Sequence, residues 1–350
     1  MDLEERKKLC RLPFFYDTSL DDLANFWQSW GWPKFQFKEL LRWAYQREWR
    51  DFTEFTTLSK EQRQVLKEHF FQSSLEVLNV FEADDGTKKI LYRLEDGQKI
   101  ETVLIPEGKR LTVCISTQVG CPIRCRFCAS GLEGMRRNLS VAEIVEQVIF
   151  ARKFASGRIT NIVVMGMGEP FLNLDNVLAA ISLFHHPWTM GIGLRKITLS
   201  TVGLRRFMPK ILKGPLYPRL AISLHSARDE VRKTLIPYPQ LMSVEEIAEF
   251  IPQYLNQANS RLTLEYVMLE GVNTSIADAK ELVKRFAHLQ VRLNLIPWNS
   301  VKGMPWSTPS KETVERFVRI LSQSSLTVTV RKRQGDSIAA ACGQLRLLHD

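Results

Sequence analysis

Three cysteines lie close together in one short segment of the chain, STQVGCPIRCRFCASG at 116–131. They are Cys121, Cys125 and Cys128, so half of the six cysteines fall within eight residues. A disulfide could use two of these thiols and would leave the third without a partner. The spacing therefore predicts that the three sulfurs act together as ligands of a metal or of a metal cluster.

Metal centres with cysteine ligands differ in the number of thiolates they need. A structural zinc ion takes four ligands, commonly as two separated pairs, and these three cysteines do not form two CxxC pairs. Cys114 could add a fourth thiol, but it lies in the apolar segment LTVCIST, where a cysteine is often a small buried hydrophobe. An electron-transfer iron–sulfur cluster also takes four cysteines. Three cysteines leave one iron of a 4Fe-4S cluster open to a substrate or cofactor, and we favour this interpretation.

The elements that must position this loop alternate along the chain. From about residue 111, short apolar segments alternate with helical ones, which predicts right-handed βαβ units, a parallel sheet and a full or partial barrel of the α/β class. Ligands bind beyond the carboxyl ends of such strands. The unusual segments fall at those ends, so we expect one site to be surrounded by the cysteine loop, GMGEP, STVG, SLHS and PWN.

Two further segments precede the alternating region, which runs from 111 to 350. Residues 1–75 read as helices, one of them beginning after Ser19 as N-cap, and five of the eight tryptophans lie here. We expect these tryptophans to pack a small helical core, the alternative being stacking on nucleic-acid bases. Residues 76–110 alternate apolar and polar residues between the turn signals DDG and EDG, which predicts an antiparallel meander.

Charge and composition indicate the class of partner. The net charge is +10, and hydrophobic and charged residues make up 45% and 25% of the chain, as in ordinary globular proteins. Without an apolar run of about 18 residues we expect no membrane span, and the charged start MDLEERKKLC predicts no secretory signal. Clustered cysteines then indicate a cytoplasmic protein. Basic residues near the candidate site suit a phosphate backbone: Arg124, Arg126, Arg136, Arg137, Arg331, Lys332 and Arg333.

The CxxxCxxC spacing, with Phe127 before the last cysteine, resembles the motif of the radical S-adenosylmethionine (SAM) superfamily. The resemblance implies a partial (βα)6-type barrel in which Cys121, Cys125 and Cys128 bind three irons of one 4Fe-4S cluster. It also implies that the fourth iron binds the amine and carboxylate of SAM, and that reduction cleaves SAM to methionine and a deoxyadenosyl radical. The segment GMGEP strengthens the resemblance, because a glycine-rich strand end often contacts the SAM amino group in this superfamily.

Segments spread over nearly the whole chain resemble the RlmN family of RNA adenosine methyltransferases: RLTVCISTQVGCPIRCRFCASG, NIVVMGMGEP, ITLSTVG, LAISLHSARDE, LNLIPWN and AAACGQL. The resemblance implies methylation of carbon 2 of adenosine in the peptidyl-transferase region of 23S rRNA and at position 37 of tRNA. This carbon lies between two ring nitrogens and is electron-poor, so a carbon radical can add to it where a methyl cation donor cannot. An external reductant of the flavodoxin type is implied, and we expect a monomer whose segment 1–75 contributes to RNA binding.

The same resemblance implies that two cysteines outside the cluster motif carry the methyl group. One SAM methylates Cys342, and the radical from a second SAM activates this methyl carbon, which then adds to adenine. Glu101, in KIETVLIP, is implied as the proton acceptor. Cys114 is implied as the thiol that attacks the sulfur of Cys342 and closes a disulfide. SAM contacts are implied for Gly168, Glu169, Ser200, Ser223, Leu224 through its backbone, His225 and Asn299.

Three alternatives remain open from sequence. The related Cfr group methylates carbon 8 of the same ribosomal adenine, although GMGEP, NLIPWN, VRKRQGDS and the tryptophan-rich start resemble RlmN more. The other two are a non-catalytic RNA-binding protein with a structural zinc, and a radical enzyme that uses SAM only once. Without the resemblance, Glu101 would be read as a solvated strand glutamate and His225 as a core histidine. Cys10 has no assigned role and is interpreted as incidental.

Overall fold

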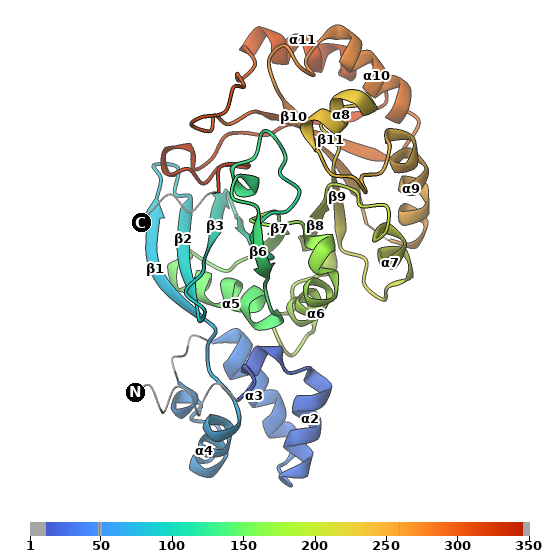
Figure 1. Ribbon diagram of the computed structural model, residues 1–350. Helices are drawn as coiled ribbons and strands as arrows, with labels where there is room; N and C mark the ends of the chain where they lie inside the picture. Colours follow the sequence, from blue (N-terminus) through green and yellow to red (C-terminus); the bar gives the residue numbers. More distant parts are fainter. Residues whose placement is uncertain (1–11, 48, 50, 259, 346–350) are drawn as a thin grey trace.

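The computed structural model describes residues 12–47, 49, 51–258 and 260–345, so Cys10 lies outside the described residues. A curved ten-stranded sheet in the order β1-β2-β3-β4-β7-β8-β9-β10-β11-β12 organises this part of the chain (Figure 1). The strands before the cysteine loop pair antiparallel, as the meander predicts: β1 Leu75–Glu82, β2 Lys88–Leu94, β3 Lys99–Glu107 and β4 Arg110–Cys114.

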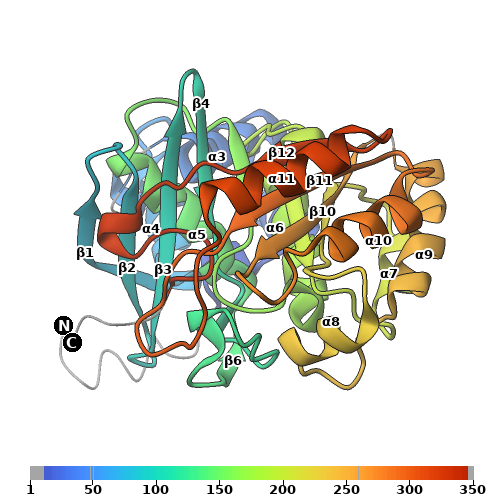
Figure 2. The ribbon, with the colours of Figure 1, turned by 90° about the horizontal axis from the view of Figure 1, so that it is seen from above.

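From β4 onward every neighbouring pair in this sheet is parallel, which confirms the predicted βαβ alternation and the partial α/β barrel. The parallel strands that follow β4 are β7 Asn161–Val164, β8 Ile197–Thr201, β9 Arg219–Ser223, β10 Leu262–Met268, β11 Val291–Pro297 and β12 Thr327–Val330. Figures 1 and 2 show the connecting helices on the outer side of this sheet: α5 Val141–Ala151, α6 Leu174–His185, α7 Met208–Lys213, α9 Val244–Gln257, α10 Ile276–Phe286 and α11 Lys311–Ser322.

Two elements were not predicted from sequence. One is helix α8, Asp229–Leu235; the other is a hairpin inside the cysteine loop, formed by β5 Gln118–Gly120 and β6 Met135–Asn138. Both are too short to show a clear period in the sequence. The remaining turns of helix are 3-10 in type: η1 Phe15–Asp17, η2 Phe52–Glu54, η3 Ala129–Gly131, η4 Arg152–Phe154, η5 Pro170–Asn173, η6 Leu194–Lys196 and η7 Asp336–Ile338.

Serine N-caps set where the helices begin. The Ser140 hydroxyl accepts the backbone N–H of Glu143, while the Glu143 side chain accepts the N–H of Ser140, which closes a capping box. Ser243 and Ser275 cap α9 and α10 in the same manner. Each cap satisfies free N–H groups of the first turn and so stabilises the start of its helix.

The helical segment before β1 forms a separate group next to α5 and α6 (Figure 1). It contains α2 Leu20–Ser29, α3 Lys34–Gln46 and α4 Lys60–His69, with Ser19 capping α2 as predicted. Trp27 and Trp49 are buried and the other three tryptophans of this segment pack against the same core, which confirms the packing role. No helix in the described part of the chain is long and apolar enough to cross a membrane.

One buried carboxylate joins this segment to the barrel. Glu146 of α5 accepts hydrogen bonds from the Ser73 hydroxyl at 2.9 Å, from the Ser74 N–H at 2.9 Å and from the Leu75 N–H at 3.1 Å. These donors lie where the chain enters β1, so the carboxylate fixes the direction in which the helices leave the sheet. Burial raises the pKa of Glu146 to about 8, against which the three hydrogen bonds act.

We expect this carboxyl group to make stability depend on pH. Its folded pKa, about 8, lies above the ordinary value of 4.5, so between these values the folded chain holds a proton that the unfolded chain has released. The free energy of unfolding should therefore fall as pH rises from about 5 to about 8. Glu146→Gln should lose its own share of this fall, so its profile should be less steep than that of the wild type, most clearly between pH 7 and 8. Urea unfolding at several pH values measures it, with the exposed Glu249→Gln as control; parallel profiles for wild type and Glu146→Gln would contradict the prediction.

Candidate active site

A cavity of about 160 Å³ lies beyond the carboxyl ends of the parallel strands, where the sequence predicts the site. All three cysteines of the loop line it together with residues from the ends of β7, β8, β9 and β11. The predicted residues that it brings together are Cys121, Cys125, Cys128, Gly168, Glu169, Ser200, Ser223, His225, Asn299 and Cys342. Three predicted residues, Glu101, Cys114 and Leu224, do not line this cavity.

The β5–β6 hairpin gives the cysteine loop its shape. Gly120 has a φ of 76°, and a Cβ there would stand 2.0 Å from the carbonyl oxygen of Gly134. That carbonyl accepts the backbone N–H of Cys121 at 2.9 Å. A second close turn brings the Cys128 N–H to the carbonyl of Cys125 at 3.1 Å. The hairpin and the turn direct the three sulfurs toward one cavity, and only glycine fits at position 120.

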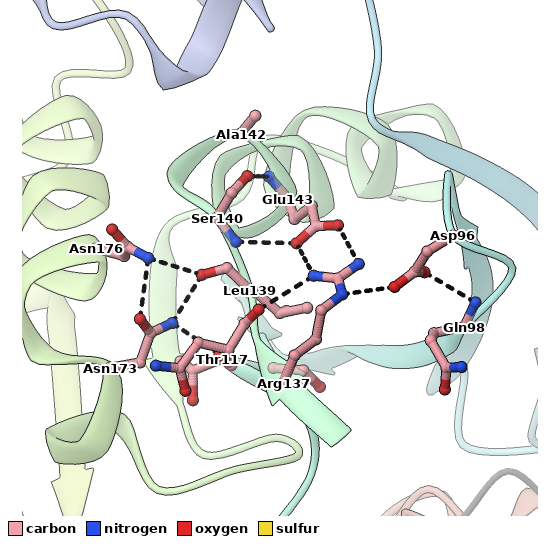
Figure 3. A network of polar contacts seen from close by, with 12 residues as sticks. Asp96, Gln98, Thr117, Arg137, Leu139, Ser140, Ala142, Glu143, Asn173 and Asn176 are labelled. Carbon is pink, nitrogen blue, oxygen red and sulfur yellow. Dashed lines mark hydrogen bonds and ion pairs between the residues drawn. The ribbon is translucent and has the colours of Figure 1, made fainter. Parts of the chain in front are cut away.

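A polar network fastens the outer strand of this hairpin to helix α5 (Figure 3). Arg137 of β6 donates two hydrogen bonds of 2.7 Å to the Glu143 carboxylate and one of 2.6 Å to Asp96. The Asn173 amide donates to the carbonyls of Thr117, just before β5, and Leu139, just after β6. The charge of Arg137 is thus balanced by two carboxylates, and its inclusion among phosphate-binding residues in the sequence analysis is corrected to a structural role.

The segment after β12 closes the other side of the loop. The backbone N–H of Ala129 donates to the Gly343 carbonyl at 2.7 Å, and the Ser130 hydroxyl donates to the Leu345 carbonyl at 2.9 Å. These contacts join residues more than 200 positions apart in sequence. They hold Cys342 at the wall of the cavity, next to the cysteine loop.

A second, smaller cavity of about 60 Å³ adjoins the first and contains the other predicted thiol, Cys114. Cys342 lines both cavities, and both thiols are free. Burial raises the pKa of Cys114 to about 12, and the proximity of Cys342 acts in the same direction. The basic residues Arg331, Lys332 and Arg333 also line this cavity. Cys342 therefore lines the cavity of the loop cysteines and also that of Cys114, and Cys128 of the loop lines both cavities as well.

Two predicted residues lie outside both cavities. Glu101 is fully buried and pairs with the Nζ of Lys89 at 3.1 Å, so it is not the solvated glutamate that its sequence alone suggests. It points to the same face of β3 as Val103, which does line the smaller cavity. Leu224 is buried, and its backbone N–H donates to the Glu265 carbonyl at 2.9 Å.

His225 and Glu169 are partly occupied by contacts with the protein itself. The Nδ1 of His225 accepts the Val267 N–H at 2.9 Å, and burial lowers the pKa of the ring to about 3. The imidazole is therefore neutral, with its proton on Nε2. The Glu169 carboxylate accepts the N–H groups of Phe171 and Val202 at 3.0 and 2.9 Å, and burial raises its pKa to about 7. Both side chains brace strand ends as well as lining the cavity.

The donor chemistry fits the cluster and cofactor that the sequence predicts. Among the residues that the structure describes, none gives the buried Oδ1 of Asn299 a hydrogen bond, while its Nδ2 donates to the Cys342 carbonyl at 3.1 Å. This oxygen lies where a ligand amine or hydroxyl could donate to it. Burial, together with repulsion between the sulfurs, raises the pKa of Cys121 to about 12 and raises that of Cys125 well above its ordinary value. Thiolates here need a positively charged partner, which the irons of a cluster supply.

Sequence reasoning missed Glu265, whose carboxylate faces the same cavity and accepts the Asn294 amide at 2.7 Å. A single acid inside the apolar strand LTLEYVM was the available signal. The role of Arg331 is also more specific than its place in a basic segment suggests. It lines both cavities. The pKa of its guanidinium is raised, mainly by Cys342 and to a smaller extent by Glu265 and Cys114, while burial acts in the opposite direction.

Two family profiles match the sequence. The profile described as the Radical SAM superfamily matches residues 115–283. A second profile, described as the ribosomal RNA large subunit methyltransferase N-terminal domain, matches residues 15–71. The first match contains the cysteine loop and most of the parallel strands, and the second contains the helical segment before β1.

Similar proteins cover almost the whole chain. The probable dual-specificity RNA methyltransferase RlmN of Thermotoga neapolitana is 42% identical over 333 residues, which is 95% of this chain and 96% of the relative. Its counterpart in Rhodopirellula baltica is 40% identical over 330 residues, covering 94% and 89% respectively. The crystal structure of a radical SAM methyltransferase from Sphaerobacter thermophilus superposes with a TM-score of 0.89 at 38% identity, covering 95% of this chain and 99% of that one.

We expect Gly120→Ala to damage the loop that carries the cysteines. The added Cβ meets the Gly134 carbonyl, and the positive φ adds strain, so the free energy of unfolding should fall by at least about 2 kcal/mol. Iron bound after anaerobic reconstitution should fall with it. Gly157→Ala is the matched control, because a Cβ there meets no atom within 4 Å. Unfolding curves and iron analysis check this; wild-type iron content in Gly120→Ala would count against the assigned role of the hairpin.

Proposed function

The chain belongs to the RlmN family of radical SAM RNA methyltransferases, and from this premise we propose that it methylates carbon 2 of adenosine in 23S rRNA and in tRNA. The position of Cys342, between the cavity of the loop cysteines and the cavity of Cys114, is the observation that carries the proposal. A methyl group on this sulfur would face the cofactor on one side and a second thiol on the other. The relatives named dual-specificity RNA methyltransferases favour two RNA substrates over the Cfr alternative.

The superfamily works with a 4Fe-4S cluster and SAM, and the residues of the larger cavity would hold them here. We assign Cys121, Cys125 and Cys128 to three irons. When bound, the cluster and SAM supply methyl groups and a one-electron route to a carbon radical, with two SAM molecules used per methylation. The residues assigned to SAM are Gly168, Glu169, Ser200, Ser223, the backbone of Leu224, His225 and Asn299.

Cys342 acts as the methyl carrier, so RNA and protein are joined through its sulfur during the reaction. Cys114 then attacks this sulfur: an S–S bond forms and the bond from sulfur to the transferred carbon breaks. The carbon keeps the bonding electrons, gains a proton and leaves as the methyl group of the RNA. Both thiols line one cavity, as this step requires, and an external reductant of the flavodoxin type returns the disulfide to two thiols.

Arg331 supports the same step through its charge. It lines both cavities, and its positive charge lowers the pKa of Cys114 against the larger effect of burial. A thiolate is the reactive form in thiol–disulfide chemistry. The guanidinium therefore favours the form of Cys114 that attacks.

Proton removal and RNA binding complete the proposal. We assign Glu101 as the acceptor of the proton from the adenine carbon. The unpaired electron of the adduct would leave with this proton, to the cluster that Cys121, Cys125 and Cys128 would hold, before Cys114 attacks. The adenine would enter the smaller cavity from the side of Val103, on the face of β3 that Glu101 shares. Residues 1–75 would form an accessory domain that binds RNA, 76–110 the β extension, and 111–350 the barrel with its C-terminal cysteine segment. In this scheme the protein acts as a monomer in the cytoplasm.

We expect the two thiol variants to fail at different stages. Cys342→Ala removes the methyl carrier, so methylation should fall at least about a thousandfold and no RNA adduct should form. Cys114→Ala keeps the carrier but cannot release it, so a covalent protein–RNA adduct should accumulate. Mass spectrometry of nucleosides and denaturing gels of the protein measure the two outcomes.

Cys342→Ser is the control for these variants, because it keeps the size of the side chain and should be as inactive as Cys342→Ala. The methylated nucleoside should be 2-methyladenosine. A product of 8-methyladenosine would assign the enzyme to the Cfr reaction, and wild-type activity in either alanine variant would reject the thiol mechanism.

Glu101→Gln should slow proton removal without blocking adduct formation. We expect the methylation rate to fall about 10²–10⁴-fold, the usual contribution of a positioned base. Glu107→Gln, at the exposed end of the same strand, is the control and should keep the wild-type rate. Single-turnover kinetics with SAM and an RNA hairpin measure both. If Glu101→Gln is as fast as the control, another group removes the proton.

A further inference from the structure

A set of arginines lies at the end of the barrel opposite to the cysteine loop. Five strands of the parallel region carry one arginine each at or next to their amino end, whereas the candidate site lies beyond the carboxyl ends. Figure 2 shows the β3–β4 turn, next to the first of them, on the other side of the molecule from β6. We call this set the amino-end arginines: Arg110, Arg195, Arg219, Arg261 and Arg292.

These arginines are close enough to repel one another. Leu220 of β9 pairs with Leu262 of β10, so the residues before them, Arg219 and Arg261, are neighbours at the edge of the sheet. The pKa of Arg219 is lowered, first by partial burial and then by the charges of the four other amino-end arginines. Five positive charges have therefore been brought together at a cost in electrostatic energy.

Carboxylates offset the charge of only one of these arginines. Within the described residues, Arg110 forms an ion pair with Glu107, and none of the other four amino-end arginines has an acidic side chain within 4.0 Å. Cations near the ends of helices can be stabilised by the helix dipole. This effect explains single cations at the ends of separate helices. It does not explain why two arginines precede paired residues of the adjacent strands β9 and β10.

A cavity of about 340 Å³ lies among them, lined by Arg195, Arg219, Ser260 and Arg261. Within the described residues, one buried donor that lines this cavity, the Oγ of Ser260, has no acceptor. The Nε of Arg292 also lacks one; this residue does not line the cavity, but its charge acts on Arg219. A buried donor without a partner is rare in proteins and costs stability. The cavity therefore combines three guanidinium groups with an unused hydroxyl donor, and an anion with several oxygen atoms would satisfy both.

We propose that the amino-end arginines bind the phosphate backbone of RNA, at a surface separate from the methylation site. The inference rests on the proposed function for the identity of the ligand, since the proposed substrates are RNAs. Guanidinium groups hold phosphate oxygens in paired hydrogen bonds, and each neutralised phosphate releases counterions. Binding of a large RNA at the amino-end arginines would raise the effective concentration of that RNA at the methylation site.

The test compares RNA binding across salt concentrations for the reconstituted full-length protein. In Arg195→Ala/Arg219→Ala/Arg261→Ala, the slope of log affinity against log salt for a protein-free 23S rRNA fragment should shrink by about two, and binding at 0.15 M salt should weaken roughly tenfold or more. The triple lysine variant should restore the slope, because lysine also neutralises a phosphate. The control removes three exposed cations from α10 and α11: Lys280, Arg316 and Arg319.

Each outcome decides the inference. An unchanged slope in the triple alanine variant overturns it, as does an equal loss in the control, which would show that any surface charge serves. A third measurement is the rise in melting temperature that inorganic phosphate causes. If the triple alanine variant loses this rise but keeps the wild-type salt slope for RNA, the cavity binds small anions and not RNA. Methylation of a short RNA hairpin, which tests the proposed function separately, should proceed at the wild-type rate in the triple variant.

Discussion

Parallel pairing is the constraint on which this protein depends. Because β4 and the six strands that follow it all run in the same direction, their carboxyl ends meet at one edge of the sheet, and every loop that leaves a strand there enters one space. The cysteine loop, the Gly168 turn and the ends of β8 and β9 gain their proximity from this alone. The same direction sends the amino ends, with their arginines, to the opposite edge, so the fold itself separates two surfaces of different chemistry.

The backbone of the cysteine loop is held from two sides by hydrogen bonds and ion pairs. Arg137 and Glu143 fasten the hairpin to α5, and the carbonyls of Gly343 and Leu345 accept hydrogen bonds from the η3 turn. Such support matters because a site built on an irregular loop is only as well ordered as the contacts around it. Cys342 belongs to one of the supporting segments, so the element that orders the loop also carries the thiol to which we assign the methyl group.

Much of this arrangement could be predicted from the sequence, for reasons that differ by residue. The alternation of apolar and helical segments predicted the barrel, and the spacing of Cys121, Cys125 and Cys128 predicted that they share one site; all three line one cavity. Both are local patterns. Glu265 was missed because its environment depends on strands far away in the sequence. Arg137 was grouped with RNA-binding residues because its two carboxylate partners, Asp96 and Glu143, become neighbours only in the folded chain.

The contact between the η3 turn and the last described residues has a consequence for biosynthesis. A ribosome adds residues one at a time, and helical or hairpin units close to the amino end can fold while later ones are still being made. The cysteine loop cannot do so in its final form, because Gly343 and Leu345 emerge more than 200 residues after Ala129 and Ser130. Assembly of iron and sulfide into this protein should thus be a post-translational event, after the barrel has closed.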